Sequence, residues 1–382
     1  DSSRGAVYSA VYVNLFGDGA EWFEGAALTA SDGAAGDEFG RSVAIEGDTA
    51  IFGANGHGSS QGAAYVFTRT SEGWVETAKL TASDGAAGDA FGWSVALSGD
   101  TAVVGSPSKN TDEGAAYVFT WDGETWSETT KLVGSGQAAF RYFGATVGIS
   151  GDTVMVAATE RATSQGAAYV FTRADGEWTE TQQLRASDAT GFDSFGSSVA
   201  ISGDRAVIGA LGQSSLRGAA YVFDRTDSTW TQSARLAASE PQVLGYFGWA
   251  VALRGDTAVI GNRGSSRHTV AGYVFARTGS TWTETSRLGT DVVADPEFGT
   301  SVALAEHTVL CGAPRDASSR GAVYVWGLDT SARLLKGKVV DSPKPSKDSY
   351  AATFELTPAS GYLTFDPATE SLTIQYGAKD AP

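Results

Sequence analysis

The stretch that decides the fold covers residues 91–132 and reads FGWSVALSGDTAVVGSPSKNTDEGAAYVFTWDGETWSETTKL. It holds four short runs that are rich in β-branched, aromatic and small residues, at 94–97, 101–105, 114–120 and 126–132. Gly-Asp and Asp-Gly pairs follow the first and third runs, and such pairs suit tight turns because glycine accepts a positive φ. No helical periodicity is present, so the stretch predicts a four-stranded antiparallel sheet.

The same pattern recurs along the chain at a fixed period. A lone four-stranded sheet cannot cover both of its faces, so sheets repeated in this way are expected to stack on one another. A period of this length is typical of propeller blades, which run to about 40–50 residues. Phe-Gly pairs begin at Phe39, Phe91, Phe143, Phe195, Phe247 and Phe298, and tryptophans stand at Trp22, Trp74, Trp126, Trp178, Trp230 and Trp282, spaced by 52 residues except for a last Phe-Gly interval of 51.

These residues resemble the FG-GAP repeat, the unit of the integrin α-subunit propeller. The matching motifs are the Phe-Gly pairs, Gly-Ala-Pro at 312–314, its variants at 53–55 and 105–107, and Gly-Ala-Ala-Tyr-Val-Phe, which recurs four times. The resemblance covers residues 1–335. It implies an all-β, seven-bladed β-propeller of four-stranded blades and an extracellular role in adhesion or ligand binding.

The two ends of the chain complete this scheme. Residues 1–30 are expected to form a half blade, 39–288 five full blades and 298–335 a sixth. Residues 336–348, KGKVVDSPKPSKD, read as an exposed connection because they combine two prolines with four lysines. Residues 349–382 resume strand-like alternation, and we expect them to complete the seventh blade, so that N- and C-terminal strands pair and close the propeller. The alternative is that they form a small separate β-module.

The sequence departs from the family pattern at the metal site. Many members carry an Asp-x-Asp-x-Asp-Gly calcium loop between the first two strands of a blade. Here that place holds a two-residue turn with one aspartate, which cannot supply the six to eight oxygens that calcium prefers. We therefore expect no metal and no cofactor. The aspartates are Asp48, Asp100, Asp152, Asp204 and Asp256.

Composition narrows the class of partner and the compartment. The 382 residues carry a net charge of −17 with a pI of about 4.6, which disfavours nucleic acid because its binding relies on basic patches. No segment approaches the roughly 20 apolar residues of a membrane span. Cys311 is the single cysteine, so no internal disulfide is possible, and its Val-Leu-Cys-Gly context predicts a buried, inert thiol. We expect an extracellular or cell-surface location.

The loops between the second and third strands differ from blade to blade while the frame repeats. Variable loops on a fixed scaffold are where binding specificity usually lies. Six arginines fall in these loops of an otherwise acidic protein, and they are the candidate ligand-binding residues for an acidic glycan or a protein. The alternative is that they are scattered surface charges. They are Arg161, Arg217, Arg263, Arg267, Arg315 and Arg320.

Two further residue sets have a functional and a structural interpretation. Paired aspartates precede three Phe-Gly motifs, at 32 and 37, 84 and 89, and 188 and 193. They suit a ring of carboxylates for cations or sugar hydroxyls, or else local turns in which Asp accepts backbone N–H groups, and we favour the turns. The periodic tryptophans suit sugar stacking or packing between blades, and their strict period favours packing.

Catalysis finds little support in the sequence. His57, His268 and His307 belong to no motif, and no Gly-x-Ser-x-Gly elbow occurs. The sequence therefore predicts a non-enzymatic extracellular binding, adhesion or structural module. It would engage a protein or a glycan through its interstrand loops. Two alternatives stay open: a polysaccharide-active lyase or glycosidase on a propeller scaffold, and an architectural subunit of an extracellular filament or a larger surface assembly.

Overall fold

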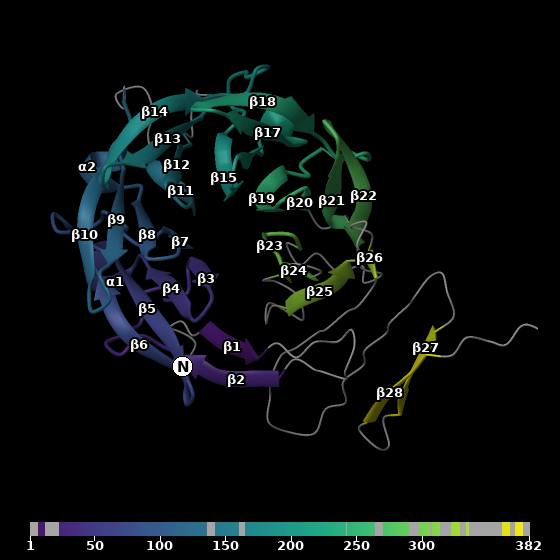
Figure 1. Cartoon of the computed structure of the whole chain (residues 1–382), viewed down its shortest axis with the longest axis horizontal. Helices are drawn as coiled ribbons and strands as arrows, with labels where there is room; N and C mark the ends of the chain where they lie inside the picture. The colour runs from purple at the N-terminus through teal and green to yellow at the C-terminus, as the bar shows by residue number, and fades with distance from the viewer. Residues whose placement is uncertain are drawn as a thin grey trace, which may run out of the picture. The chain divides into compact units, whose positions relative to one another are not determined.

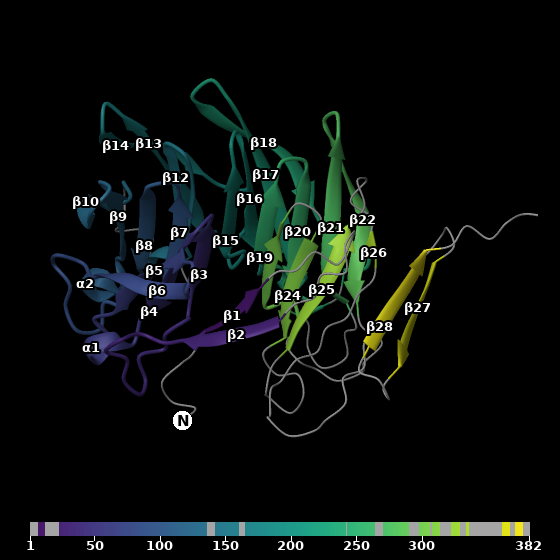
Figure 2. The same cartoon turned by 60° about the horizontal axis from the view of Figure 1, so that its bottom comes forward.

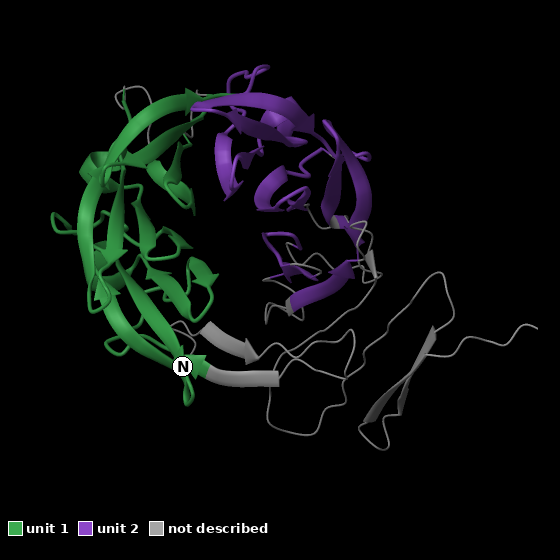
Figure 3. Ribbon diagram, in the orientation of Figure 1, with its two compact units in different colours: residues 1–185 green, residues 186–382 purple. Residues whose placement is uncertain are grey.

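The structure is a computed structural model. It describes residues 7–11, 23–135, 142–159, 165–241, 243–263, 270–289, 298–305, 308–313, 322–328, 334–335, 361–366 and 371–376. The chain divides into two compact units, Asp1–Arg185 and Ala186–Pro382 (Figure 3). Each unit is described by itself below.

Unit 1 holds a two-stranded sheet and three four-stranded antiparallel blades (Figure 1). In every blade each strand pairs with the next strand of the chain, as expected for segments joined by tight turns. The two-stranded sheet is β1 (Val7–Val11) and β2 (Phe23–Leu28). The blades are β3 (Val43–Glu46), β4 (Thr49–Ala54), β5 (Ala63–Thr70) and β6 (Gly73–Leu80); β7 (Ser94–Ser98), β8 (Thr101–Ser106), β9 (Ala115–Trp121) and β10 (Trp126–Leu132); and β11 (Phe143–Ser150), β12 (Thr153–Ala158), β13 (Ala167–Ala174) and β14 (Glu177–Leu184).

Unit 2 repeats this order, and Figure 2 shows strands of one of its blades, β19 to β22, side by side. Its described residues form three four-stranded blades and one two-stranded sheet. The blades are β15 (Phe195–Ser202), β16 (Arg205–Ala210), β17 (Ala219–Thr226) and β18 (Thr229–Leu236); β19 (Phe247–Arg254), β20 (Thr257–Asn262), β21 (Val270–Thr278) and β22 (Thr281–Gly289); and β23 (Ser301–Leu304), β24 (Thr308–Ala313), β25 (Ala322–Leu328) and β26 (Leu334–Leu335). The last sheet is β27 (Gly361–Asp366) with β28 (Ser371–Tyr376).

The predicted number of blades is wrong. The described residues form six four-stranded blades rather than seven, and the strands near the two ends form sheets of two strands each, β1–β2 and β27–β28. Only four residues separate β27 from β28 in the sequence, so their pairing closes a much smaller loop than a pairing of opposite chain ends. Loop closure costs about 0.6 kcal/mol more for each doubling of loop length, which favours the local hairpin.

The exposure of β3 agrees with the two-stranded sheet that precedes it in the chain. Val43 and Ile45 of β3 are 52% and 63% exposed. Val147 and Ile149 stand at the same repeat positions of β11, and they are only 7% and 8% exposed because β7 and β8 of the preceding blade pack against β11. Contact with the preceding blade therefore buries Val147 and Ile149 of β11.

The strand prediction for residues 91–132 is confirmed by β7, β8, β9 and β10. The sequence did not predict a one-turn element before the third strand of three blades. These elements contain residues with left-handed φ values, which explains why no helical pattern marks them. They are α1 (His57–Ser60), α2 (Lys109–Asp112) and α3 (Gln213–Leu216).

At Phe91, Phe143 and Phe247, the Phe-Gly motif bridges a blade to the one before it. Phe91 forms an isolated parallel bridge with Gly62, and its N–H donates to the Gln61 carbonyl at 3.1 Å. Gly92 has a φ of +88°, and a Cβ there would lie 2.2 Å from the Ala63 carbonyl oxygen. A Cβ on Gly53, the first glycine of the Gly-Ala-Asn variant, would lie 1.9 Å from the Gly92 oxygen. The two motifs therefore meet backbone to backbone, where only glycine fits.

Apolar side chains from successive blades fill the space between them. In unit 1, Ile51 and Val66 of one blade share a buried cluster with Val104 and Tyr117 of the next. In unit 2, Cys311 is fully buried among Val259, Val274 and the β24–β25 residues, which confirms the predicted buried thiol. Burial raises the pKa of this thiol.

A serine–carboxylate clasp adds a polar connection between outer strands. The Ser83 N–H and hydroxyl donate to the two Glu128 carboxylate oxygens at 2.7 and 2.8 Å. Ser83 follows β6 and Glu128 lies in β10, so the clasp ties the fourth strands of neighbouring blades. The same contact recurs at Ser31–Glu76, Ser135–Glu180, Ser187–Gln232 and Ser239–Glu284.

Candidate functional site

The densest group of charged side chains in the β7–β10 blade surrounds Asp84. The Tyr117 hydroxyl and the Lys131 ammonium each donate to one Asp84 carboxylate oxygen, both at 2.6 Å. Lys109 of α2 donates to Asp89 at 2.8 Å and also to the Asp84 backbone carbonyl. The loop before β7, the start of α2, β9 and β10 thus meet at one end of the blade.

Neighbouring charges and hydrogen bonds keep Asp84 and Lys109 in their ionised forms. Burial alone raises the pKa of Asp84, but hydrogen bonds from Lys131 and Tyr117 and the charges of both lysines outweigh it and hold that pKa at about 2. Burial lowers the pKa of Lys109, yet Asp89 and Asp84 more than offset this and raise it. Burial, and then Asp84, raise the pKa of Tyr117. Each carboxylate is therefore balanced by a neighbouring cation.

The β3–β6 blade carries the same arrangement with a histidine in place of Lys109. Tyr65 and Lys79 donate to the two Asp32 oxygens at 2.7 and 2.5 Å. His57 Nδ1 lies 2.8 Å from Asp37, and its Nε2 lies 2.8 Å from the Lys79 ammonium. These partners assign the proton to Nδ1, which donates to Asp37, while Nε2 accepts from Lys79.

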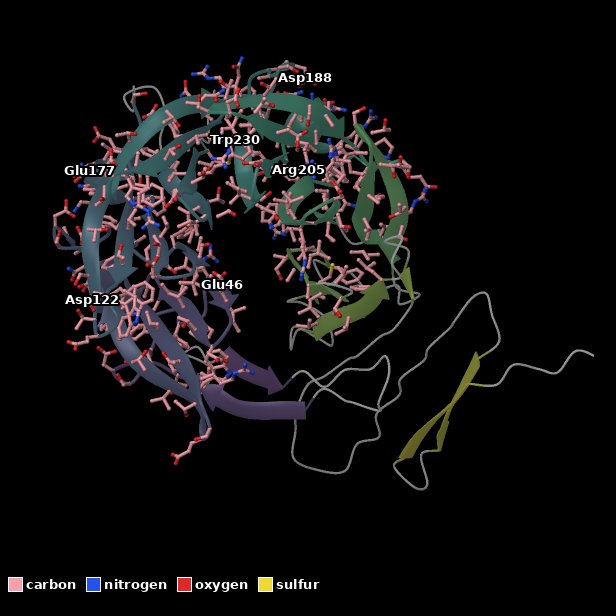
Figure 4. All side chains as sticks on the ribbon, viewed as in Figure 1. Glu46, Asp122, Glu177, Asp188, Arg205 and Trp230 are labelled. Atoms are coloured by element: carbon pink, nitrogen blue, oxygen red, sulfur yellow. The ribbon has the colours of Figure 1, made fainter. Side chains whose placement is uncertain are left out.

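Unit 2 holds a third version in the β15–β18 blade. The Tyr221 hydroxyl donates to Asp188 at 2.7 Å, and Arg235 Nε lies 3.2 Å from the second Asp188 oxygen. Arg235 also donates to the Gln213 side-chain oxygen at 2.8 Å. Figure 4 labels Asp188. A neutral glutamine thus occupies the place of His57 and Lys109.

The acidic residue at the position of Asp84 and the cationic residue at the position of Lys131 change together from blade to blade. Glu240 replaces the first aspartate in the β19–β22 blade and pairs with Arg287 at 2.7 Å. In the β11–β14 repeat, the sequence has Gly136 at the acidic position and Gln183 at the cationic one, so both charges are absent together. This co-variation within one chain indicates structural ion pairs.

The second aspartate of each pair holds its own loop. Oδ2 of Asp37, Asp89 and Asp193 accepts the backbone N–H of the residue three positions earlier, at 2.9, 2.7 and 2.6 Å. The local-turn interpretation is therefore confirmed for the second aspartate of each pair, because its oxygen has a backbone donor. It is wrong for the first aspartate, which binds tyrosine and lysine or arginine side chains instead.

The periodic tryptophans pack under arginines of the third strand. Arg225 pairs with Asp204 of the hairpin turn at 2.7 Å, and its guanidinium carbon lies 5.6 Å from the ring centre of Trp230, which Figure 4 labels. Arg69 and Arg173 make the same pair of contacts in their blades. In the β7–β10 blade Trp121 replaces the arginine and packs against Trp126. Trp178 and Trp230 are buried, which confirms the packing interpretation for them.

Two of the six predicted loop arginines lie in the part of the chain that the structure describes. Arg217 follows α3 and is exposed, and its carbonyl accepts the Phe247 N–H at 3.1 Å. Arg263 follows β20, and its guanidinium carbon lies 4.2 Å above the Trp249 ring. Arg161, Arg267, Arg315 and Arg320 lie outside the described residues.

Sequence reasoning missed a group of exposed apolar side chains in unit 2. Phe192, Val243 and Leu244, in the loops before β15 and β19, are 64%, 57% and 40% exposed. Alignment of the repeats contained a signal for them, because glycine gives way to bulky residues at one position. That position reads Gly36, Gly88, Phe140, Phe192 and Leu244.

Comparison with known protein families identifies the repeat. A family model described as the FG-GAP repeat matches residues 22–67, 74–119, 126–171, 178–223, 230–275 and 282–326. Each match begins at one of the periodic tryptophans, and the last five of these lie in the fourth strand of a blade. Each match ends in a third strand, so these five run from one blade into the next. No curated protein matches the chain. Among the described residues, no helix is long and apolar enough to cross a membrane.

Proposed function

Because the chain belongs to the FG-GAP repeat family, whose fold is an all-β propeller of four-stranded blades, we propose that it is a non-enzymatic extracellular binding module. It engages a protein or glycan partner through the loops between the second and third strands. FG-GAP repeats are typical of extracellular proteins, which supports this location.

One observation carries the proposal: the charged side chains that recur in the blades pair with one another, whereas the loops between the second and third strands differ from blade to blade. Asp84 and Asp188, together with their equivalents, are bonded to lysine, arginine or tyrosine of the same blade. The loops between the second and third strands differ in sequence from blade to blade, although three of them share a one-turn element, and they carry the predicted arginines. Variation confined to loops on a repeated scaffold is typical of recognition surfaces.

The surroundings of His57 favour binding over catalysis. His57 donates to Asp37 and accepts from Lys79, and Lys109 or Gln213 fills the same place in other blades. A catalytic acid or base would need one particular titrating group, whereas this position keeps only its hydrogen-bonding role. His268 and His307 lie outside the described residues.

The test is a glycan array together with a pull-down from extracellular matrix extracts. The protein would be compared with R263A and with a variant in which all six loop arginines are alanine. R69A is the control for R263A, because it also removes one positive charge but lies in strand β5 rather than in a loop between the second and third strands. We expect the loop variants to lose the partner and R69A to keep it. Binding that all variants retain would contradict the proposal, and ordered polymers of the isolated protein would favour the architectural alternative.

A further inference from the structure

Two exposed apolar residues of unit 2 have unfavourable backbone conformations. Phe192 has a φ of 71° and Leu244 a φ of 62°, in the left-handed region that non-glycine residues seldom adopt. At the equivalent positions of unit 1 the chain has Gly36 and Gly88, with φ values of 90° and 87°. A Cβ on either glycine would meet nothing within 4 Å. The backbone of this loop therefore suits glycine, and a side chain here extends into solvent.

Burial does not compensate for the strain at these positions. The Phe192 side chain is 64% exposed, Leu244 is 40% exposed, and the adjacent Val243 is 57% exposed. Strained backbone that supports exposed apolar surface is a pattern of interaction sites, because a bound partner supplies the missing burial.

The short element α3 holds the two loops at its opposite ends. The Gly212 N–H, just before α3, donates to the Asp193 carbonyl at 3.0 Å. The Tyr246 N–H donates to the Leu216 carbonyl, at the end of α3, at 3.1 Å. Phe192 and the Val243–Leu244 pair therefore flank one turn, and Arg217 follows that turn directly. We refer to Phe192, Arg217, Val243 and Leu244 as the 192–244 surface.

The charge on this surface comes from Arg217. Three acidic groups lie in the two loops: Asp188 pairs with Arg235, Glu240 pairs with Arg287, and Asp193 is buried and accepts hydrogen bonds from the N–H and hydroxyl of Thr190. Arg217 is exposed, and it forms no ion pair with any residue that the structure describes. At physiological salt the Debye length is about 8 Å, so a group bound here senses Arg217 far more than the distant charges behind the net −17.

We propose that the 192–244 surface binds a protein segment that presents apolar side chains on both sides of a carboxylate. The inference rests on the proposed binding function and selects protein over glycan. Val243 and Leu244 offer no hydrogen-bonding group to sugar hydroxyls, whereas aliphatic and aromatic contacts beside one arginine suit a peptide.

The test uses labelled ten-residue peptides with leucines on both sides of a glutamate, and fluorescence anisotropy with the full chain. Matched peptides carry lysine in place of glutamate, or serine in place of leucine. F192G/L244G installs the glycines found in unit 1, so it should fold at least as well as the parent, with an equal or higher Tm. V75S, at a 48% exposed valine of β6, is the control for loss of exposed apolar surface.

We expect the leucine–glutamate peptides to bind, and F192G/L244G to weaken binding by about tenfold or more, as for the loss of a hot-spot side chain. R217A should weaken the glutamate peptides and leave the lysine peptides unaffected, and V75S should change nothing. Equal binding by F192G/L244G, a preference for the lysine peptides, or no binding by the parent protein overturns the proposal.

Other occupants give different results. Glycan-array signals that F192G/L244G abolishes would assign the surface to a glycan, and self-association that this variant abolishes would assign it to a second copy of the chain. Either result overturns the inference. Partner binding that R263A loses and F192G/L244G keeps would leave the proposed function standing and refute this inference alone.

Discussion

The glycines with positive φ in this chain are of two kinds: at some an added Cβ would clash with backbone, and at others it would meet no atom. Gly92 and Gly88 have nearly the same φ, +88° and +87°, but a Cβ on Gly92 would lie 2.2 Å from the Ala63 oxygen, whereas one on Gly88 meets nothing within 4 Å. We expect G88A to cost about 1 kcal/mol of unfolding free energy from the left-handed conformation alone. G92A should cost roughly 3 kcal/mol or more, because backbone must shift at the seam. Urea unfolding measures both, and equal costs would refute the role assigned to the seam.

Asp84 predicts how stability depends on acid. Its folded pKa is about 2, below the ordinary value of 3.8, so it stabilises the folded state above about pH 4. This contribution is lost as the pH falls toward 2. The side chain is 45% exposed, so solvent screening limits the effect to below about 1 kcal/mol.

Thermal unfolding between pH 5 and pH 2 tests this expectation. The difference in Tm between the parent protein and D84N should shrink as the pH falls through that window. Y117F removes one donor to Asp84, so the pH-dependent part of the difference between Y117F and the double variant Y117F/D84N should be smaller. A difference between parent and D84N that stays constant across the window would contradict the assignment.

At the scale of elements, the serine–carboxylate clasp ties successive outer strands. Glu128 accepts two hydrogen bonds from Ser83, and the fourth blade performs the same function with Gln232. We therefore expect E128Q to change the unfolding free energy by less than about 0.5 kcal/mol, and E128A to lower it by about 1–2 kcal/mol. Chemical denaturation of the two variants measures this. An E128Q variant as unstable as E128A would show that charge, rather than hydrogen bonding, matters at this clasp.

The strands themselves follow closely from the sequence. Glycine–aspartate turns and short apolar runs located β7 to β10, because those signals are local in the chain. The third-strand tyrosine and the ion pairs around Asp84 join residues 33 and 47 positions apart, so only a column-by-column comparison of repeats can find them. The one-turn elements escaped prediction because left-handed residues such as Asn110 and Thr111 leave no helical period.

At the scale of the whole molecule, chemical labelling of the Cys311 thiol measures how often the β23–β26 blade unfolds. Cys311 is the only cysteine in the sequence and is fully buried in β24, so a thiol reagent reaches it only when its blade opens. We expect labelling to be slow in native buffer and to accelerate with urea in parallel with unfolding. The urea-unfolded chain supplies the reference rate. Rapid labelling that is independent of urea would contradict the packing around this thiol.

The number of blades and the binding surface depend on relations that a single repeat does not contain. The period indicated how many blades to expect between the ends, but the pairing of terminal strands is a non-local choice, and there the prediction of a seventh blade was wrong. The six loop arginines were predicted from charge and loop variability. The sequence shows that Phe192 and Leu244 replace a glycine, but their exposure and strained backbone are known only from the structure.

The spacing of the ion-paired residues has a consequence for the gene. Asp32 and Lys79, Asp84 and Lys131, and Asp188 and Arg235 are each 47 positions apart, which is shorter than the repeat period of 52. A recombination event that duplicates or deletes one 52-residue period beginning just before the aspartate therefore includes both the aspartate and its lysine or arginine partner. Each new copy then contains a complete ion pair, and its loops can change in sequence without leaving an unpaired charge.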